Sequence, residues 1–257
     1  MTLELTAGDE AMLAGEEGEG VALAMRVLVA TAEAMGAERL LDITSAHVDG
    51  CLYHGPSGLD FARALVSGGA RVKVPTTLNV SSLDLLHPEL VRLDRATAEQ
   101  ARALMDTYVE LGCRPTWTCA PYQLPERPKL GEQVAWGESN AIVFANSVLG
   151  ARTERYGDFL DISAAVTGRA PAVGLHTDEG RLPTLVVAAD ELTDDLAANE
   201  ALYPLLGHVL GRVADSHVAA ITGLPSAADE DDLKALGAAA ASSGSVAMRP
   251  EERRGGK

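Results

Sequence analysis

The sequence is short of aromatic residues, which make up only 4% of its 257 positions. Ala, Val and Leu must therefore fill most of the core, and a 47% hydrophobic content suffices for one α/β unit or two small domains. No run approaches the roughly 20 apolar residues of a membrane span. The apolar run 21–30 is interrupted by Arg26 and follows glutamates instead of the basic residues of a signal peptide. These absences predict a cytoplasmic protein that does not enter a membrane.

Basic residues and cysteines are also few. There are 21 Lys and Arg against 37 Asp and Glu, giving a net charge of −16. Binding DNA or RNA requires a basic face that neutralises phosphates, so the charge argues against a nucleic-acid partner. Cys51, Cys113 and Cys119 form no Cys-x-x-Cys pair, and an odd number of cysteines gives no disulfide framework. They are expected to be free thiols or metal ligands.

Helix and strand patterns alternate along the chain. A capping box formed by Thr6 and Asp9 starts a short first helix, and Pro204 is expected to kink or break the helical stretch 196–213. The predicted helices cover residues 7–13, 20–35, 59–66, 96–111, 141–149, 159–166, 196–213 and 229–241. The predicted strands cover 40–43, 71–74, 184–188 (buried), 218–222, and a segment that starts near 245 and ends near 248. This alternation predicts an α/β fold with a mostly parallel sheet, in which ligands bind where strands end.

Two polar segments come after predicted strands in the first third of the chain. Residues 46–55 (AHVDGCLYHG) place two His, an Asp, a Cys and two Gly in one loop, where the main chain can approach a ligand closely. A loop with one buried His and one buried Cys fits this pattern equally well. Residues 75–79 (PTTLN) offer hydroxyls and an amide, although a simple turn before a helix is favoured there.

Two further polar segments lie between residues 118 and 152. In 118–122 (TCAPY), Pro121 would stiffen a loop that presents Cys119, although a lone cysteine is usually an inert core residue. Glu138, Ser139 and Asn140 precede an apolar helix, whose free N–H groups favour an anionic ligand. A capped helix with one polar face is the alternative. If these segments form one site, all four must converge in space.

These segments carry a family resemblance. The strings HVDGCLY, VPTTLN, TWTCAPY, GEQVAWGESNAIVFANSVLGAR and GRAP-AVGLH occur in one order and resemble the large subunit of aconitase X over nearly the whole chain, from about Leu3 to Met248. Members of that family are hydro-lyases, among them cis-3-hydroxy-L-proline dehydratases and mevalonate-5-phosphate dehydratases. The resemblance implies an aconitase-like three-layer α/β/α architecture, an iron–sulfur cluster and a small swivelling domain, which is either fused or a separate partner subunit.

The resemblance also implies roles for particular residues. Cys119 would be a ligand of the iron–sulfur cluster. The residues expected against a small hydroxy-acid substrate are Gly50, Cys51, Leu52, Asn79, Val80, Glu138 and Ser139. The Asp-Gly-Cys of the 46–55 loop favours cis-3-hydroxy-L-proline over mevalonate 5-phosphate. The iron would act as a Lewis acid on the departing hydroxyl, while an unidentified base removes a proton next to the carboxylate.

The sequence departs from the family near its C-terminal end. Family large subunits continue past this point through a Cys-Pro-His motif and a further Cys, whereas here no Cys comes after Cys119. We therefore expect one incomplete catalytic domain over residues 1–248 and a disordered tail over 249–257. A truncated, non-catalytic fragment and an enzyme without a cluster are the alternatives to a working dehydratase.

Overall fold

The computed structural model describes residues 3–189, 196, 199–215, 217–244 and 247–250. Its sheets are small and mostly parallel, as expected. The three-stranded sheets β3-β2-β4 and β6-β7-β8 are parallel, and β1 pairs with β5 in an antiparallel ribbon. The strands are β1 (Leu40–Asp42), β2 (Ala46–Val48), β3 (Thr76–Leu78), β4 (Ala135–Trp136), β5 (Arg169–Pro171), β6 (Leu185–Ala188), β7 (Val218–Thr222) and β8 (Ala247–Pro250). The three-layer arrangement implied by the resemblance stays a prediction.

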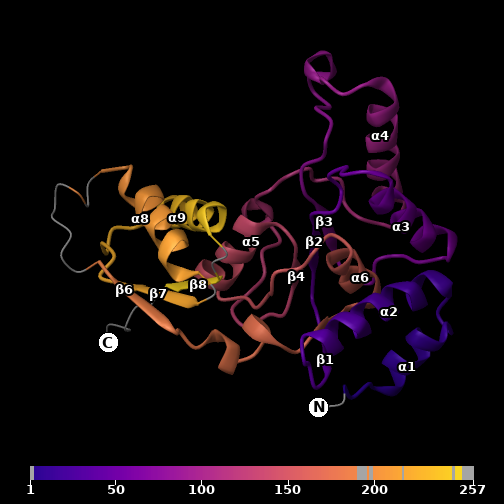
Figure 1. Ribbon diagram of the computed structural model, residues 1–257, viewed down its shortest axis with the longest axis horizontal. Coiled ribbons are helices and arrows are strands. Elements are labelled where there is room, and N and C mark those ends of the chain that lie inside the picture. Colours follow the sequence, from indigo (N-terminus) through magenta and orange to yellow (C-terminus); the bar gives the residue numbers. More distant parts are fainter. Residues whose placement is uncertain (1–2, 190–195, 197–198, 216, 245–246, 251–257) are drawn as a thin grey trace.

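Helices surround the sheets in two groups (Figure 1). The larger group, with the α4 arm projecting from it, surrounds β1 to β5, and α8 and α9 lie beside β6 to β8. The α-helices are α1 (Ala7–Ala14), α2 (Glu19–Ala34), α3 (Pro56–Ser67), α4 (Arg95–Glu110), α5 (Ser139–Phe144), α6 (Leu160–Thr167), α8 (Leu202–Ala214) and α9 (Glu230–Ser243). A π-helical turn, Ala145–Leu149, continues α5. No described helix has the length and apolar character needed to span a membrane.

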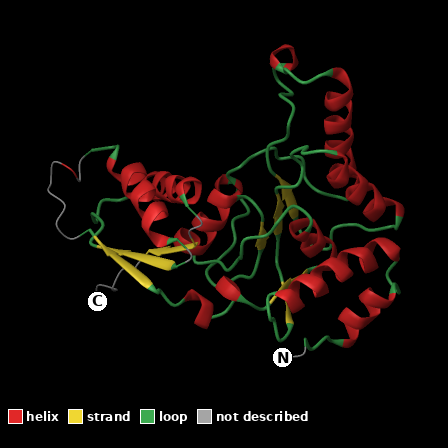
Figure 2. Cartoon of the chain, viewed as in Figure 1, coloured by secondary structure: helices red, strands yellow, loops and turns green. Residues whose placement is uncertain are grey.

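The core consists mostly of Ala, Leu and Val side chains, as the scarcity of aromatics predicted. One cluster packs α2, α3 and α6 against β2, and a second joins α8 and α9 to β6 and β7. A third, smaller cluster includes Tyr122, Trp136 and Phe144, with the rings of Tyr122 and Phe144 stacked at 4.0 Å. Figure 2 shows short strands and long loops between the two groups of helices.

Several helix starts agree with the sequence. Thr6 forms the predicted capping box with Asp9 at α1, and Asp229 caps α9 through a second capping box with Asp232. The predicted interruption at Pro204 takes the form of a break, because residues 199–201 are not helical and α8 begins at Leu202. Pro204 lies in the first turn of α8, where its missing N–H removes no helical hydrogen bond.

Three strand predictions need correction. The strand expected at 71–74 is absent from the described chain, because Val72 and Lys73 donate their N–H groups to the Leu111 and Ala165 carbonyls in loop contacts. The strand β3 instead begins just after Pro75, so that Thr76 and Thr77 belong to the strand itself.

The other two corrections concern the second parallel sheet. The strand β6 alternates between half-buried and exposed residues and is not buried, because it lies at a sheet edge. The strand β8 continues through Arg249 and Pro250, beyond the predicted end at Met248. Of the predicted tail, residues 251–257 lie outside the described residues.

Candidate active site

The predicted polar segments converge at one edge of the β3-β2-β4 sheet. The strands run parallel, with His47 paired to Thr77 and to Trp136, so their carboxyl ends lie side by side. Asp49 and Asn79 come directly after β2 and β3, and Glu138 comes after β4 and one glycine. The structure thus brings together residues from three separate stretches of sequence, at the position where parallel sheets bind ligands.

A buried amide joins two carboxylates at this edge. Asn79 donates from Nδ2 to Glu138 Oε2 at 3.0 Å and to Asp49 Oδ1. The Asn79 side chain is 3% exposed, and its Oδ1 has no hydrogen-bond partner among the described residues. A buried acceptor without a partner is costly, so this atom is available to a ligand donor.

Asp161 supports the Asp49 loop. It lies in the first turn of α6, is completely buried, and accepts the Asp49 main-chain N–H at 2.7 Å. A Cβ atom at Gly137 would lie 2.7 Å from the same carboxylate, so only glycine lets β4 approach this closely. Asp161 was not among the residues predicted from the sequence, although an Asp within the apolar segment 160–167 indicates a buried carboxylate that needs hydrogen-bond partners.

The electrostatics of the cluster are unfavourable to negative charge. Burial raises the pKa of Asp49, and the charges of Glu138 and Asp158 raise it further, while the Asn79 hydrogen bond and His54 oppose the shift. Burial also raises the pKa of Asp161, against the two backbone N–H groups that it accepts. No ion pair within the described part of the chain joins a Lys or Arg to Asp49 or Glu138.

The turn at Gly50 and Cys51 packs closely against Asp158 and Tyr108. A Cβ at Gly50 would lie 2.7 Å from the Asp158 carbonyl oxygen and 2.9 Å from the Tyr108 hydroxyl. The buried Cys51 thiol donates to the Asn79 carbonyl at 3.2 Å, and burial raises the pKa of this thiol. Cys51 therefore supports the loop with its side chain and offers only main-chain groups to a ligand.

The Cys119 loop lies beside the start of α5. Asn140 donates from Nδ2 to the Cys119 carbonyl at 3.1 Å, and Tyr122 donates its hydroxyl proton to Asn140 Oδ1 at 2.7 Å. Glu138 caps α5 by accepting the Asn140 N–H at 3.1 Å, so the 138–140 triplet opens a helix as predicted. Ser139 and Cys119 are exposed, Leu52 is half-buried and Val80 is 44% exposed.

The cysteines do not fit a complete iron–sulfur cluster in this chain. Cys119 is exposed, whereas Cys51 and Cys113 are buried, and desolvation raises the pKa of both buried thiols. Thiolates are the usual protein ligands of such clusters. Within the described ranges no group of three or more His, Cys, Asp or Glu side chains is placed to hold a metal ion. One ligand, Cys119, is what the described residues offer.

His47 is a structural residue of the sheet. It is completely buried, and its Nδ1 lies 2.7 Å from the Thr77 hydroxyl. Burial lowers its pKa to about 3, against an opposing contribution from the Thr118 backbone. The imidazole is therefore neutral near pH 7. This outcome agrees with the buried-His alternative for the 46–55 loop.

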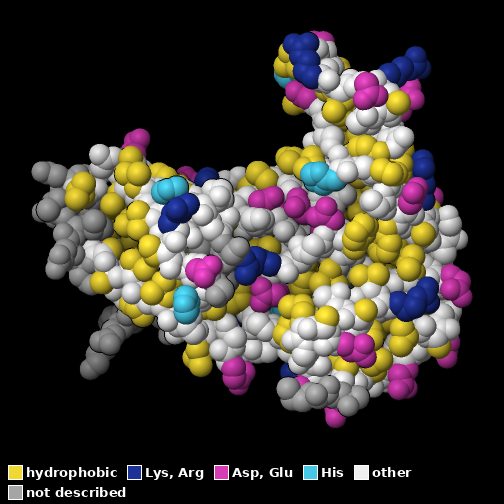
Figure 3. Space-filling view, in the orientation of Figure 1, with side chains coloured by type: hydrophobic (Ala, Val, Ile, Leu, Met, Phe, Trp, Pro, Cys, Tyr) yellow, Lys and Arg dark blue, Asp and Glu magenta, His cyan; other side chains and the backbone are white. Residues whose placement is uncertain are grey.

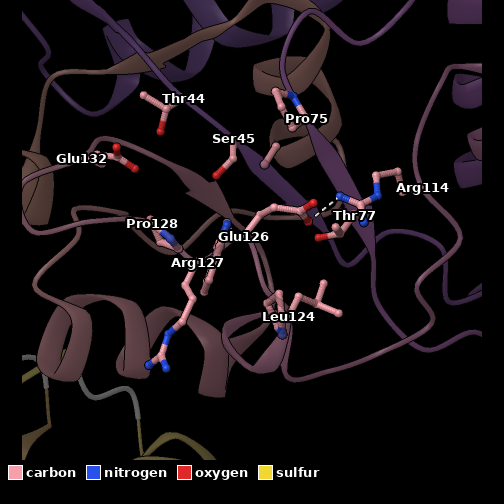
Figure 4. Close-up of a pocket in the computed structure, with 13 residues that line it drawn as sticks. Thr44, Ser45, Pro75, Thr77, Arg114, Leu124, Glu126, Arg127, Pro128 and Glu132 are labelled. Carbon is pink, nitrogen blue, oxygen red and sulfur yellow. Dashed lines mark hydrogen bonds and ion pairs between the residues drawn. The ribbon is translucent and has the colours of Figure 1, made fainter.

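A cavity of about 270 Å³ opens at the opposite, amino-terminal end of these strands (Figure 4). Ser45, Pro75 and the Arg114–Glu126 ion pair line it, and the N···O distance of that pair is 2.7 Å. Asp49, Asn79, Glu138 and Cys119 do not line this cavity. The polar cluster, and not this cavity, is the candidate active site.

Comparison with known proteins identifies the family of the chain. The family model "Aconitase X first domain" matches residues 2–179, and "Aconitase X second domain" matches residues 183–249. A cis-3-hydroxy-L-proline dehydratase of Pseudomonas aeruginosa is 48% identical over 245 residues, covering 95% of this chain and 42% of the relative. A phosphomevalonate dehydratase large subunit of Methanothermobacter thermautotrophicus is 41% identical over 244 residues, covering 93% of this chain and 59% of that subunit.

A solved structure agrees with these matches. The crystal structure of Thermococcus kodakaraensis aconitase X in its holo-form superposes with a TM-score of 0.83 at 36% identity, covering 96% of this chain and 61% of that one. The chain thus spans about two fifths to three fifths of the length of the relatives it matches.

Proposed function

The chain belongs to the aconitase X family, and on that premise we propose that it acts in a hydro-lyase that removes water from cis-3-hydroxy-L-proline. The proposal includes the small swivelling-domain subunit as partner, since the matching archaeal relatives are named large subunits. The observation that carries it is the Asp49–Asn79–Glu138 cluster, which gathers polar groups from three strands at one sheet edge.

The residues of this chain would bind and orient the substrate. Gly50, Cys51 and Leu52 would contact it through the main chain, and Asn79 and Glu138 through their side chains, with Val80 and Ser139 at the rim. Asp161 would hold the Asp49 loop through its hydrogen bond to the Asp49 N–H, and Gly137 would let the main chain before Glu138 pack against that loop. Precise placement of substrate groups is itself a large part of catalysis.

The proposal includes an iron–sulfur cluster for which this chain would provide only part of the ligand set. Cys119 would be the ligand from this chain, and the other ligands would come from elsewhere in the assembly. When bound, such a cluster supplies a Lewis acid for the leaving hydroxyl. The roles of Asp49, Asn79 and Glu138 in holding the substrate do not depend on it.

Two alternatives arise from particular findings. Mevalonate 5-phosphate as substrate is supported by the 41% identity to a phosphomevalonate dehydratase large subunit. A chain that keeps the fold without catalysis is supported by the single available thiol ligand. The identities of 48% and 45% to two cis-3-hydroxy-L-proline dehydratases favour the proline substrate.

An activity screen tests the proposal. The product of the full-length gene, co-expressed with the small subunit and purified anaerobically, is incubated with cis-3-hydroxy-L-proline or with mevalonate 5-phosphate, and loss of substrate is monitored by mass spectrometry. Consumption of the proline alone is the expected result. Consumption of mevalonate 5-phosphate alone would replace the substrate, and consumption of neither would favour the non-catalytic alternative.

A further inference from the structure

The two carboxylates at the sheet edge share a hydrogen-bond donor, but neither forms an ion pair with a Lys or Arg among the described residues. Both Asp49 and Glu138 accept hydrogen bonds from the single Nδ2 group of Asn79. The described residues place no Lys or Arg in an ion pair with either of them. Arg152 and Arg169, which carry charge elsewhere in this half of the chain, are paired with other aspartates. Two partly buried carboxylates thus lie together without a Lys or Arg ion pair in the described part of the chain, although the charge of His54 acts on Asp49, and this arrangement favours a bound cation.

Asn79 provides a second, independent indication of a ligand. Its side chain is only 3% exposed, yet Oδ1 lacks a partner within the part of the chain described. Because Nδ2 already donates to both carboxylates, Oδ1 needs an N–H or O–H donor. An ammonium group carries the positive charge that suits the two carboxylates and the N–H donors that Oδ1 lacks. A phosphate group has the opposite charge and no donor when fully ionised.

We propose that Asp49 and Glu138, joined by Asn79, bind the ammonium group of an amino-acid substrate, and that Asp49 is the residue that selects such a substrate over a phosphorylated acid. This inference rests on the proposed function and places the nitrogen of the substrate beside the Asp49 and Glu138 carboxylates of the same site. The buried Asp161 holds the Asp49 main chain, so that the carboxylate keeps its place beside Asn79. Glu138 is held by its own capping bond to Asn140.

Non-reacting probes separate charge recognition from catalysis. L-Proline has the ring, the carboxylate and the ammonium group. Tetrahydrofuran-2-carboxylic acid keeps the ring and the carboxylate but has oxygen in place of nitrogen. Isothermal titration calorimetry of both probes is performed with the chain co-expressed with its small subunit. We expect L-proline to bind at least ten-fold more tightly than the oxygen analogue, and the affinity ratio of the two probes to fall to about one in Asp49→Asn.

Matched variants control for net charge and for folding. Asp158→Asn removes the same charge from a residue close enough to raise the pKa of Asp49, and it should retain the affinity ratio within about two-fold. Glu138→Gln serves as a second variant should Asp49→Asn fail to fold, and it should lower the ratio in the same direction. Circular dichroism and thermal melting verify that each variant is folded.

Each outcome has a defined meaning. An unchanged ratio in folded Asp49→Asn and Glu138→Gln, or no preference for L-proline in the wild type, would overturn the ammonium site. If that happened while the assembly still consumed cis-3-hydroxy-L-proline, the proposed function would stand and only this inference would fall. If the wild type bound mevalonate 5-phosphate and ignored L-proline, both would fall.

Discussion

The molecule contains two three-stranded parallel sheets whose central strands, β2 and β7, are followed by different residues. The β3-β2-β4 sheet places Asp49, Asn79 and Glu138 at its carboxyl edge. The described residues directly after β7, in the β6-β7-β8 sheet, are Gly223, Leu224 and Pro225, which carry no ionisable group. The two sheets share a pairing pattern, but the described residues after their central strands differ, and such residues, not the topology, create a site.

The interiors of the two regions differ in the same way. Every described Asp, His, Asn, Arg, Ser or Thr side chain that is buried lies at or before Arg181. In the second region α8 and α9 instead approach closely through glycines, and a Cβ at Gly211 would lie 2.6 Å from the Ala240 carbonyl. The first region therefore contains the buried polar side chains, whereas the second is stabilised by the close packing of α8 against α9. Figure 3 shows acidic side chains gathered near the middle of one face of the molecule.

The largest expected difference between the regions is in their response to acid. Burial lowers the pKa of His47 to about 3, below its ordinary value of 6.5. The unfolded chain therefore binds a proton at higher pH, so stability from this residue is present above pH 6.5 and is lost as pH falls toward 3, by up to about 5 kcal/mol.

Urea unfolding between pH 7.5 and 4.5 measures this effect. His47→Gln should flatten the pH dependence of the free energy of unfolding. His217→Gln, which changes an exposed histidine of the second region, should leave it unchanged. If the free energy of unfolding depends on pH equally in His47→Gln and in the wild type, His47 does not make the first region more sensitive to acid than the second.

Overpacking the helix contact should affect the second region most. In Gly211→Ala the new methyl group meets the Ala240 backbone, which cannot shift cheaply, so we expect a loss of about 1–3 kcal/mol. Gly58→Ala is the control, because nothing lies within 4 Å of a Cβ at that helical glycine, and it should gain about 0.5–1 kcal/mol. Denaturant midpoints give both values, and a neutral Gly211→Ala would contradict the close approach.

A methyl group at Gly137 should damage the site with little effect on the second region. It would lie 2.7 Å from Asp161 Oδ2 and 3.1 Å from Asp49 Cβ, so the main chain that precedes Glu138 must move away. We expect the affinity for L-proline in the co-expressed assembly to fall at least ten-fold, or about 1.4 kcal/mol. Unchanged affinity would show that the site tolerates this displacement.

The smallest expected effect concerns the thiols. Ellman's reagent should modify Cys119 quickly in the folded chain, and Cys51 and Cys113 only when the chain unfolds, because those two are buried. Cys119→Ser should remove the fast phase without altering the free energy of unfolding. Fast reaction of two or more thiols would mean that the Cys51 loop opens readily.

Local patterns in the sequence were sufficient for many of the elements. Capping residues and apolar periodicity located α1, α4 and α9 closely, because these signals depend on neighbouring residues. The predicted 71–74 strand is absent because the main-chain N–H groups of Val72 and Lys73 donate instead to the distant carbonyls of Leu111 and Ala165. No local pattern reports such long-range partners.

For the site, the sequence by itself determined which residue types stand at the strand ends, and the four polar segments carried the family resemblance. Only the tertiary structure decided how they combine. The hydrogen bond from Asp49 to Asp161 spans 112 residues, and that between Asn79 and Glu138 spans 59. The same structure buried the Cys51 thiol and left Cys119 exposed. Burial and long-range hydrogen bonds depend on the packing of α6 and the three strands together, which is a property of the folded chain and not of any single segment.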